Sequence, residues 1–183
     1  TLKTFSDSFD QLYQCKPHEI QMGILKRLRG SPVIRHTESF DLRFSPLPPY
    51  SILSTSTVDF KTMQRINRFA RYWDMIGNSG RFAHSLPYIL NDQPFDNFLD
   101  LSDWIFEKTE QTHKINLKRL YELVAQACES LFPNSYQELI NNMENDYLRS
   151  KLKGSFNRLE LSQSSKQELK VKNKHSSRQQ RHL

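Results

Sequence analysis

Three basic side chains near the start of the sequence could bind an anionic ligand. Lys26, Arg27 and Arg29 follow the apolar segment Glu19–Leu25, which we interpret as a β-strand. Parallel sheets present their ligand sites at the carboxyl ends of their strands, so a cation placed there can meet a carboxylate or a phosphate. The alternative is a solvated surface charge, and the sequence leaves both interpretations open. Gly30 closes the basic run and is expected to serve backbone geometry.

Two further segments carry polar groups that could contact a substrate. Tyr50 follows Pro48 and Pro49, which could hold its hydroxyl in a cleft or simply lay the ring on a helical surface. Asn78 and Arg81 belong to the segment NSGRF at a predicted helix end, where Asn satisfies free carbonyl groups and Arg complements the helix dipole. We therefore expect helix capping from these two residues, with substrate contact as the alternative.

The sequence identifies neither a catalytic centre nor a metal site. His18 and Glu19 point to opposite faces of the predicted strand and precede its carboxyl end, so we assign them a structural role. Cys15 and Cys128 lie far apart with no partner at ligand spacing, which indicates plain thiols rather than a disulfide or a zinc site. Glycine-rich nucleotide loops, HExxH helices and nucleophile elbows are absent from the sequence.

The start of the sequence predicts a helix followed by a strand. Within the predicted helix Thr1–Tyr13, apolar residues recur at helical spacing: Leu2, Phe5, Phe9, Leu12 and Tyr13. Together with the strand Glu19–Leu25, this helix is expected to form the last αβ unit of an α/β barrel or open sheet whose earlier strands are not part of the sequence. We assign residues 1–35 to this unit.

The rest of the sequence is predicted to be helical after an irregular connection. The stretch from about residue 30 to 58 is rich in proline, which excludes a helix there, and we assign residues 36–58 to a connecting loop. A loop of such length is typical of one that lies over a site. Trp73 and Trp104 lie on apolar helical stripes and are predicted core residues. Four helices are expected within the domain 59–153, namely Asp59–Gly80, Phe95–Lys108, Leu117–Leu131 and Tyr136–Leu152.

The net charge of +6 is concentrated at the C-terminal end. Residues 154–183 hold seven basic but only two acidic side chains and are rich in Ser, Gln, Asn and Lys. We predict a disordered, solvated tail, with weak, salt-sensitive contact with RNA or an acidic partner as the alternative. The other residues are close to neutral, which argues against a nucleic-acid partner. Because no apolar run is long enough for a membrane span and no signal peptide is evident, we expect a cytoplasmic protein without a membrane partner.

Three linked motifs make residues 1 to about 130 similar to a known enzyme family. They are TLKTFSDSFDQL followed by HEIQMGILKRLRGSPV, the segment PLPPYSILST at 46–55, and NSGRF at 78–82. In this order they resemble the C-terminal part of radical S-adenosylmethionine (SAM) proteins that carry an N-terminal cobalamin-binding domain. The Cys-x3-Cys-x2-Cys and cobalamin-binding His motifs of that family are absent, so the resemblance implies a piece of such an enzyme or a degenerate relative.

This resemblance implies a fold and a cofactor site. The fold class is expected to be mostly α with a small α/β part: the terminal helix–strand unit of an incomplete radical SAM (β/α) barrel, then a helical C-terminal bundle and the tail. In the family, a [4Fe-4S] cluster held upstream cleaves SAM to a 5′-deoxyadenosyl radical. The end of the predicted strand helps to form the adenine pocket, which by position implicates Ile24, Leu25 and Lys26 in SAM binding. The substrate, the reaction type and the use of cobalamin stay open.

Two hypotheses for function follow. In the first, the chain packs on the upstream barrel of the same protein and helps to close its SAM and substrate site. Arg27, Tyr50 and Arg81 are then candidate substrate contacts, while the chain alone supplies no catalytic residue, binds no metal or cofactor and is inactive. In the alternative, the chain is a non-catalytic helical interaction module with a basic tail.

Overall fold

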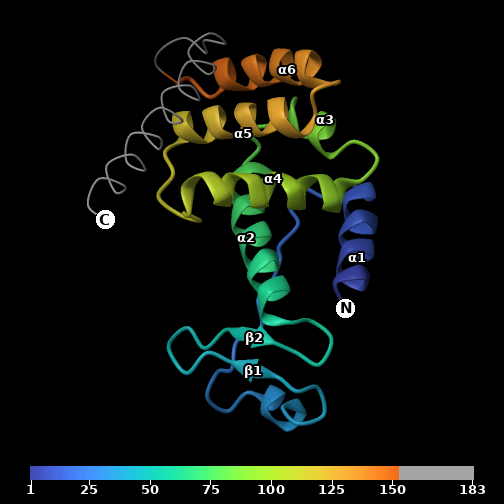
Figure 1. Ribbon diagram of the computed structural model, residues 1–183, viewed down its shortest axis with the longest axis vertical. Helices are drawn as coiled ribbons and strands as arrows, with labels where there is room; N and C mark the ends of the chain where they lie inside the picture. The colour runs from blue at the N-terminus through green and yellow to red at the C-terminus, as the bar shows by residue number, and fades with distance from the viewer. Residues whose placement is uncertain (153–183) are drawn as a thin grey trace, which may run out of the picture.

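The computed structural model describes residues 1–152 of the chain, which are mostly helical with one small antiparallel sheet (Figure 1). The elements follow in the order α1 (Leu2–Gln14), the 3₁₀ helix η1 (Pro32–His36), β1 (Arg43–Phe44), β2 (Ile52–Ser54), α2 (Phe60–Ile76), α3 (Leu86–Leu90), α4 (Pro94–Thr109), α5 (Leu117–Leu131) and α6 (Tyr136–Arg149). The mostly helical class expected from the sequence is confirmed. Its β part is an antiparallel hairpin rather than a parallel strand.

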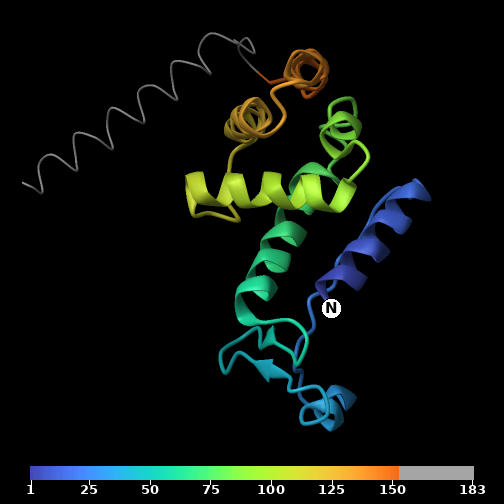
Figure 2. The same ribbon diagram turned by 45° about the vertical axis from the view of Figure 1, so that its right-hand side comes forward.

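Helix α2 connects two parts of different size. Helices α4, α5 and α6 are stacked in layers, with α1 beside α2 under α4, and together they form the helical body (Figures 1 and 2). The first turn of α2 leads out of this body to the hairpin of β1 and β2, which with η1 and the adjoining loops forms a smaller lobe. One side of α2 therefore lies in the body, and its N-terminal end belongs to the lobe.

Polar side chains fix the beginnings of α2 and α5. Asp59 accepts a hydrogen bond of 2.7 Å from the backbone N–H of Thr62 at the start of α2, and Asn116 accepts one of 2.9 Å from Arg119 at the start of α5. These contacts satisfy backbone donors that have no partner in the first turn of a helix. The predicted helices Phe95–Lys108 and Leu117–Leu131 are confirmed within one residue at each end.

Aromatic rings make up the centre of the body. Phe9 of α1 packs edge-on against Phe69 and Trp73 of α2, with ring centroids 5.1 and 4.8 Å apart. Phe95 and Phe98 of α4 complete the cluster, and Phe98 lies 5.0 Å from Trp73. Edge-to-face pairs of this kind add stabilisation to the burial of apolar surface. Trp73 is thus a core residue as predicted.

Trp104 occupies the margin of the core rather than its centre. Its ring is partly buried, and the ammonium group of Lys108 lies 5.3 Å from its centroid. Phe60, the first residue of α2, is 56% exposed because the first turn of this helix lies outside the body.

The stretch from 30 to 58 contains short regular elements between its turns and loops. In β1 and β2, Arg43 lies opposite Ser54 and Phe44 lies opposite Ile52, and Pro32–His36 forms η1. The prolines that argued against structure lie at the start of η1 and in the turn of the hairpin, where no ladder hydrogen bond is required. A small separate core of Leu42, Ile52 and Met63 holds the lobe on α2.

The predicted strand Glu19–Leu25 is extended but is not part of a sheet. Ile20, Met22 and Ile24 are buried or half-buried and alternate with exposed residues, as in a strand. Within residues 1–152, however, no backbone hydrogen bond joins residues 21–24 to another segment. A strand requires a neighbour, and the described part of the chain provides one only at Lys26, which bridges to Ser51. The sheet of the described residues has two strands and forms no barrel.

Helix ends were predicted less well than helix starts. Helix α2 ends at Ile76 instead of Gly80, α6 ends at Arg149 instead of Leu152, and the short helix α3 was not predicted. Gly80 adopts a φ of +66° in the loop after α2, so it serves this turn rather than the helix end. The tail predicted for residues 154–183 lies outside the described residues.

Replacement of Gly77 by Ala should destabilise the protein, although alanine is the better helix former. A Cβ atom at Gly77 would stand 2.6 Å from Cδ2 and Cε2 of the buried Trp73 ring. We expect a loss of about 1 to 3 kcal/mol in the free energy of unfolding, the usual cost of overpacking a core. Urea denaturation followed by circular dichroism measures it. Gly23→Ala is the matched control, because a Cβ there meets nothing within 4 Å. Equal stability of the two variants would contradict this account of Gly77.

Candidate ligand groove

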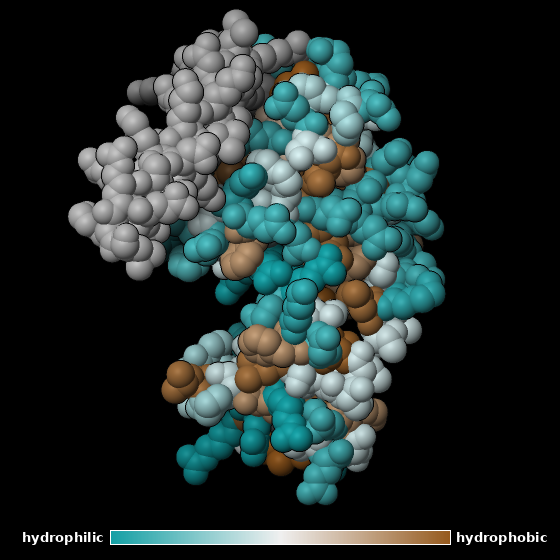
Figure 3. Space-filling view, viewed as in Figure 1, coloured by the Kyte–Doolittle hydropathy of each residue, from teal (hydrophilic) through white to brown (hydrophobic). Residues whose placement is uncertain are grey.

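A groove of about 1010 Å³ lies where the body meets the lobe. The space-filling view shows the molecule hollowed at this level (Figure 3). One wall is the extended segment after α1, the second is the outer face of α2, and the hairpin and the region after α4 close its ends. Its lining includes Met22, Ile24, Leu25, Lys26, Ile52, Gln64, Asn67, Arg68, Arg71, Asp74 and Phe106.

The first wall combines apolar side chains with backbone groups. Met22 packs on the core of the body and Ile24 on the core of the lobe, so the segment is held at both ends. The N–H of Ile52 donates to the carbonyl of Leu25 at 2.9 Å, and the N–H of Arg27 donates to that of Tyr50 at 3.0 Å. Between these bonds and Ile20, the backbone is extended and has no hydrogen-bond partner among the described residues. A ligand or another strand can pair with it there.

The second wall is the polar face of α2. Gln64, Asn67, Arg68, Arg71 and Asp74 recur at intervals of three and four residues. Residues at this spacing share one face of a helix, so the stripe runs along the whole groove. The opposite face of α2 carries the aromatic residues of the core, which fixes the rotation of the helix and hence the direction of the polar stripe.

Arg68 is the most firmly placed cation in the groove. Its Nη2 donates to Oδ1 of Asp103 at 3.2 Å, and its guanidinium carbon lies 4.4 Å from the centroid of the Phe106 ring. Asp103 also accepts from Nε of Arg65 at 2.6 Å. Two arginines therefore share one carboxylate, and the cation–π contact orients the Arg68 plane against the aromatic ring.

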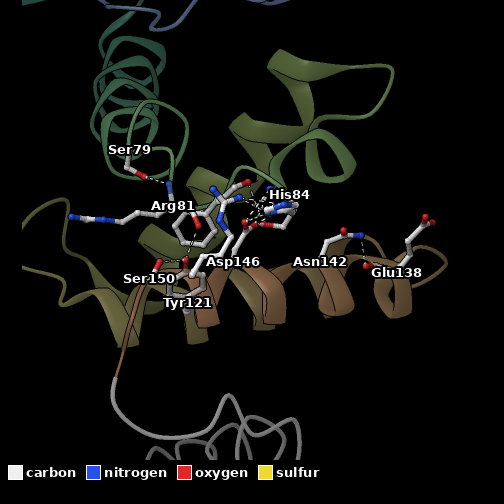
Figure 4. Close-up of polar contacts among 11 residues, drawn as sticks. Ser79, Arg81, His84, Tyr121, Glu138, Asn142, Asp146 and Ser150 are labelled. Carbon is white, nitrogen blue, oxygen red and sulfur yellow. Dashed lines mark hydrogen bonds and ion pairs between the residues drawn. The ribbon is translucent and has the colours of Figure 1, made fainter.

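The structure separates the six residues predicted to bind ligands. Ile24, Leu25 and Lys26 all line the groove. Arg27 and Tyr50 are joined by their backbones next to it, but both side chains are exposed and neither lines it. Arg81 lies elsewhere, in the loop after α2 that packs on α5 and α6, and its side chain points away from that packing (Figure 4).

Asn78 holds the extended segment in place, which differs from the helix capping that we expected. Its Oδ1 accepts from the N–H of Ile20 and its Nδ2 donates to the carbonyl of Ile20, both at 3.1 Å. Nδ2 also lies 3.2 Å from Oδ1 of Asp74. One amide side chain thus imitates the backbone of a neighbouring strand. The sequence carried no signal for this pairing, since 58 residues separate the two partners.

A Ser–His–Asp cluster between α3 and α6 serves the fold and is unsuited to catalysis (Figure 4). Asp146, 1% exposed, accepts from the backbone N–H groups of His84 and Ser85 and from the Ser85 hydroxyl at 2.8 Å. Its Oδ1 lies 2.7 Å from Nδ1 of His84. The serine is fully buried, so a substrate does not reach its hydroxyl, and it bonds the aspartate rather than the histidine. The buried carboxylate instead fastens α6 to the loop before α3.

The described residues contain no group of three or more His, Cys, Asp or Glu side chains that could hold a metal ion. Cys15 is exposed at the end of α1, while Cys128 is buried in α5, where burial raises the pKa of its thiol to about 12. The two thiols therefore lie in different environments. His18 and Glu19 are both exposed and line a separate hollow beside α3.

Residues 38–183 match a family described as protein of unknown function, DUF4080. The chain belongs to the DUF4080 family. No curated protein matches the chain, and no solved structure does. Among residues 1–152, no helix is both long enough and apolar enough to cross a membrane. The hairpin and helices α2 to α6 lie within the family region, while α1, the extended wall and η1 precede it.

Removal of the Asn78 amide should release the extended wall of this DUF4080 chain. Asn78→Ala leaves the N–H and carbonyl of Ile20 without partners, and we expect a loss of about 1 to 3 kcal/mol in stability. Hydrogen exchange at the Ile20 amide should accelerate beyond what the global loss explains. Asn145→Ala, at an exposed position on α6, is the control and should change neither quantity. Unchanged exchange at Ile20 in the Asn78 variant would show that apolar packing alone holds the segment.

The two cysteines should differ sharply in reactivity. Because the Cys128 pKa is raised, its thiolate forms only as the pH approaches about 12, and the side chain is buried besides. We expect a thiol reagent such as DTNB to modify one cysteine in the folded protein at mildly alkaline pH and both in urea. Cys15→Ser should abolish the reaction of the folded protein, whereas Cys128→Ser should leave it intact. Rapid modification of Cys128 would mean that α5 opens readily.

Proposed function

We propose that this chain is the C-terminal part of a cobalamin-type radical SAM enzyme and that its groove helps to close the SAM and substrate site. The observation that carries the proposal is the set of three motifs, in the order found in that family, over residues 1 to about 130. Two of these motifs, at 46–55 and 78–82, fall within the region matched to DUF4080, and the first lies before it. The hairpin and the loop after α2 contain them.

The unpaired backbone of residues 21–24 supports this proposal. The segment is extended, its side chains alternate between inside and outside, and its N–H and carbonyl groups have no partners in the described part of the chain. These are the properties of a strand whose neighbours come from elsewhere. An upstream barrel of the same protein would supply such a neighbour, and the carboxyl end of the strand would then face the groove.

The groove suits SAM but offers nothing for the cluster. Ile24, Leu25 and Ile52 give the groove an apolar wall for a flat base, and free backbone groups lie beside them. Cys15 and Cys128 cannot provide the clustered thiolates that a [4Fe-4S] cluster needs. The proposal therefore places cluster binding in an upstream part, and whether cobalamin takes part stays open.

The residues of this chain would have three tasks in that enzyme. SAM supplies the radical chemistry when it is bound and cleaved. Ile24 and Leu25 would exclude water from the base, and Lys26 would contribute positive charge at the end of the strand. The hairpin would cover the groove from the side of the lobe. Orientation and exclusion of water are the contributions a protein makes to such chemistry.

A specific observation also favours the alternative, a non-catalytic interaction module. Large apolar side chains with at least 41% exposure gather on the lobe and its approach: Leu25, Leu28, Ile34, Phe40, Leu47, Tyr50 and Phe60. Surfaces of this type mark contacts with other proteins. An upstream barrel would cover the same surface, so the exposed apolar residues do not distinguish the enzyme from the interaction module. A test of SAM chemistry does.

The decisive test begins with the reading frame upstream of Thr1, which should contain a Cys-x3-Cys-x2-Cys motif. In the full-length protein, reduced and supplied with SAM, Lys26→Ala should lower the formation of 5′-deoxyadenosine about tenfold, equivalent to roughly 1.4 kcal/mol. Leu25→Asp should abolish SAM binding, because it places an unpaired charge on the apolar wall. Lys61→Ala, exposed on α2 outside the groove, is the control. A reading frame without the motif, or full activity in both variants, would leave the interaction module as the better account.

A further inference from the structure

The polar face of α2 has chemistry that an adenine pocket does not use. Gln64, Asn67, Arg68 and Arg71 turn toward the groove at helical spacing, across from the apolar wall. Of these four side chains, only Arg68 makes a hydrogen bond or ion pair with another described residue, Asp103. A helix face that lines a groove and carries many hydrogen-bond donors, few of them paired within the described residues, is suited to binding a polar ligand.

Arg68 is a partly buried cation. Arg65 and Arg68 share the carboxylate of Asp103, whose side chain is 23% exposed. Asp100, on the same helix, acts electrostatically on Arg65, so these two arginines are balanced by two carboxylates. Arg68 is 20% exposed and held against Phe106. A positive charge removed from water to this degree gains more from an anionic partner than a solvated one does.

Hydrogen bonding points the same way. Nε of Arg68 is buried and has no hydrogen-bond partner in residues 1–152. A buried donor left unpaired is unfavourable, so a small movement of the side chain that lets a ligand oxygen accept from Nε would stabilise the complex. A guanidinium group fixed on two sides presents its remaining donors in a plane, which fits the two oxygens of a carboxylate or phosphate.

Two further cations are available in the same groove. Lys26 on the extended wall and Arg71, one turn along α2 from Arg68, make no ion pair with any residue the structure describes. The one anion of the lining used here, Asp74, is engaged by the Asn78 amide at 3.2 Å. Positive side chains thus dominate the polar part of the groove, while Phe106, Ile24 and Ile52 make the adjoining part apolar.

We propose that Arg68 and Arg71 recognise an oxyanion on the ligand of this groove, a carboxylate or a phosphate, attached to a flat apolar group that rests on Phe106 and the extended wall. The ligand class follows from the groove alone, and the statement that it is the substrate rests on the proposed function. Arg68 is held in position by Asp103 and Phe106, whereas the exposed Arg71 side chain binds the oxyanion from one turn along the helix. Gln64 and Asn67 form hydrogen bonds with polar groups farther along the ligand.

Binding of small probes to the chain 1–183 tests this without any radical chemistry. The probes are benzoate, inorganic phosphate and benzamide, the last being the neutral counterpart of benzoate. Binding is followed by NMR through the Nε–H resonances of the arginines and the ring of Phe106. We expect benzoate or phosphate to shift the Arg68 and Arg71 signals with millimolar affinity, as suits ligands of so few atoms. Benzamide should bind at least about tenfold more weakly, since its loss of charge removes roughly 1.4 kcal/mol.

Matched variants locate the site. Arg71→Gln should weaken binding of the anionic probe about tenfold, which corresponds to roughly 1.4 kcal/mol, without changing the fold, because its side chain is exposed and has no described partner. Arg81→Gln makes the same change of charge outside the groove and should leave the affinity unaltered. Should Arg68→Gln unfold the protein by exposing Asp103, Arg68→Lys, which keeps the charge but loses the planar fork, replaces it.

The outcomes are separable. Benzoate binding alone assigns the site to carboxylates, phosphate binding alone assigns it to phosphate esters, and either result supports the oxyanion proposal. It is overturned if neither anion shifts the Arg68 and Arg71 signals, if benzamide binds as well as benzoate, or if Arg71→Gln and Arg81→Gln weaken binding equally. An intact oxyanion site in a full-length protein that forms no 5′-deoxyadenosine would refute the radical SAM function while leaving this inference standing.

Discussion

Packing of the aromatic face of α2 between α1 and α4 is the constraint on which the other features depend. Phe69 and Trp73 are buried against Phe9, Phe95 and Phe98, so the helix can neither rotate nor slide without opening this cluster. When one face of a helix is buried, the directions of the side chains on its other faces are fixed as well. The polar stripe facing the groove is therefore positioned by the core. Gly77 belongs to the same arrangement, because only a residue without a side chain leaves room for the Trp73 ring.

The second wall of the groove depends on contacts of another kind. The extended segment gains little from backbone pairing and is held by Ile20, Met22 and Ile24, by the Asn78 amide and by the short bridge to the hairpin. It spans the core of the body and that of the lobe, so the width of the groove depends on how these two cores are joined. The free backbone edge and the exposed apolar residues of the lobe lie near this segment, which makes this side of the molecule the natural place for a further protein segment to pack.

The polar sites at Asp146 and Arg68 differ in how fully their hydrogen-bonding groups are paired. At Asp146 a buried carboxylate is fully hydrogen-bonded and holds α6 to the loop before α3, which is a structural use. At Arg68, by contrast, Nε is without a hydrogen-bond partner among the described residues, and the two unpaired cations Lys26 and Arg71 line the same groove. The difference between these two polar sites is the reason for assigning ligand recognition to the groove and stability to the Ser–His–Asp cluster.

The sequence by itself determined most of the helices, because apolar periodicity is a local signal. It also indicated that residues 19–25 are extended, since a strand-like apolar alternation is local too, whereas the roles of Ile24 and Leu25 in SAM binding stay a prediction. Only the tertiary structure decided the partner of Asn78, the hairpin within the proline-rich stretch, and the unpaired state of residues 21–24, since each depends on residues far apart in the chain. The polar stripe of α2 was present in the sequence at regular spacing, yet such a stripe usually faces water. It became a candidate site only when the fold placed Lys26, Phe106 and the extended segment opposite it, and no local pattern encodes that juxtaposition.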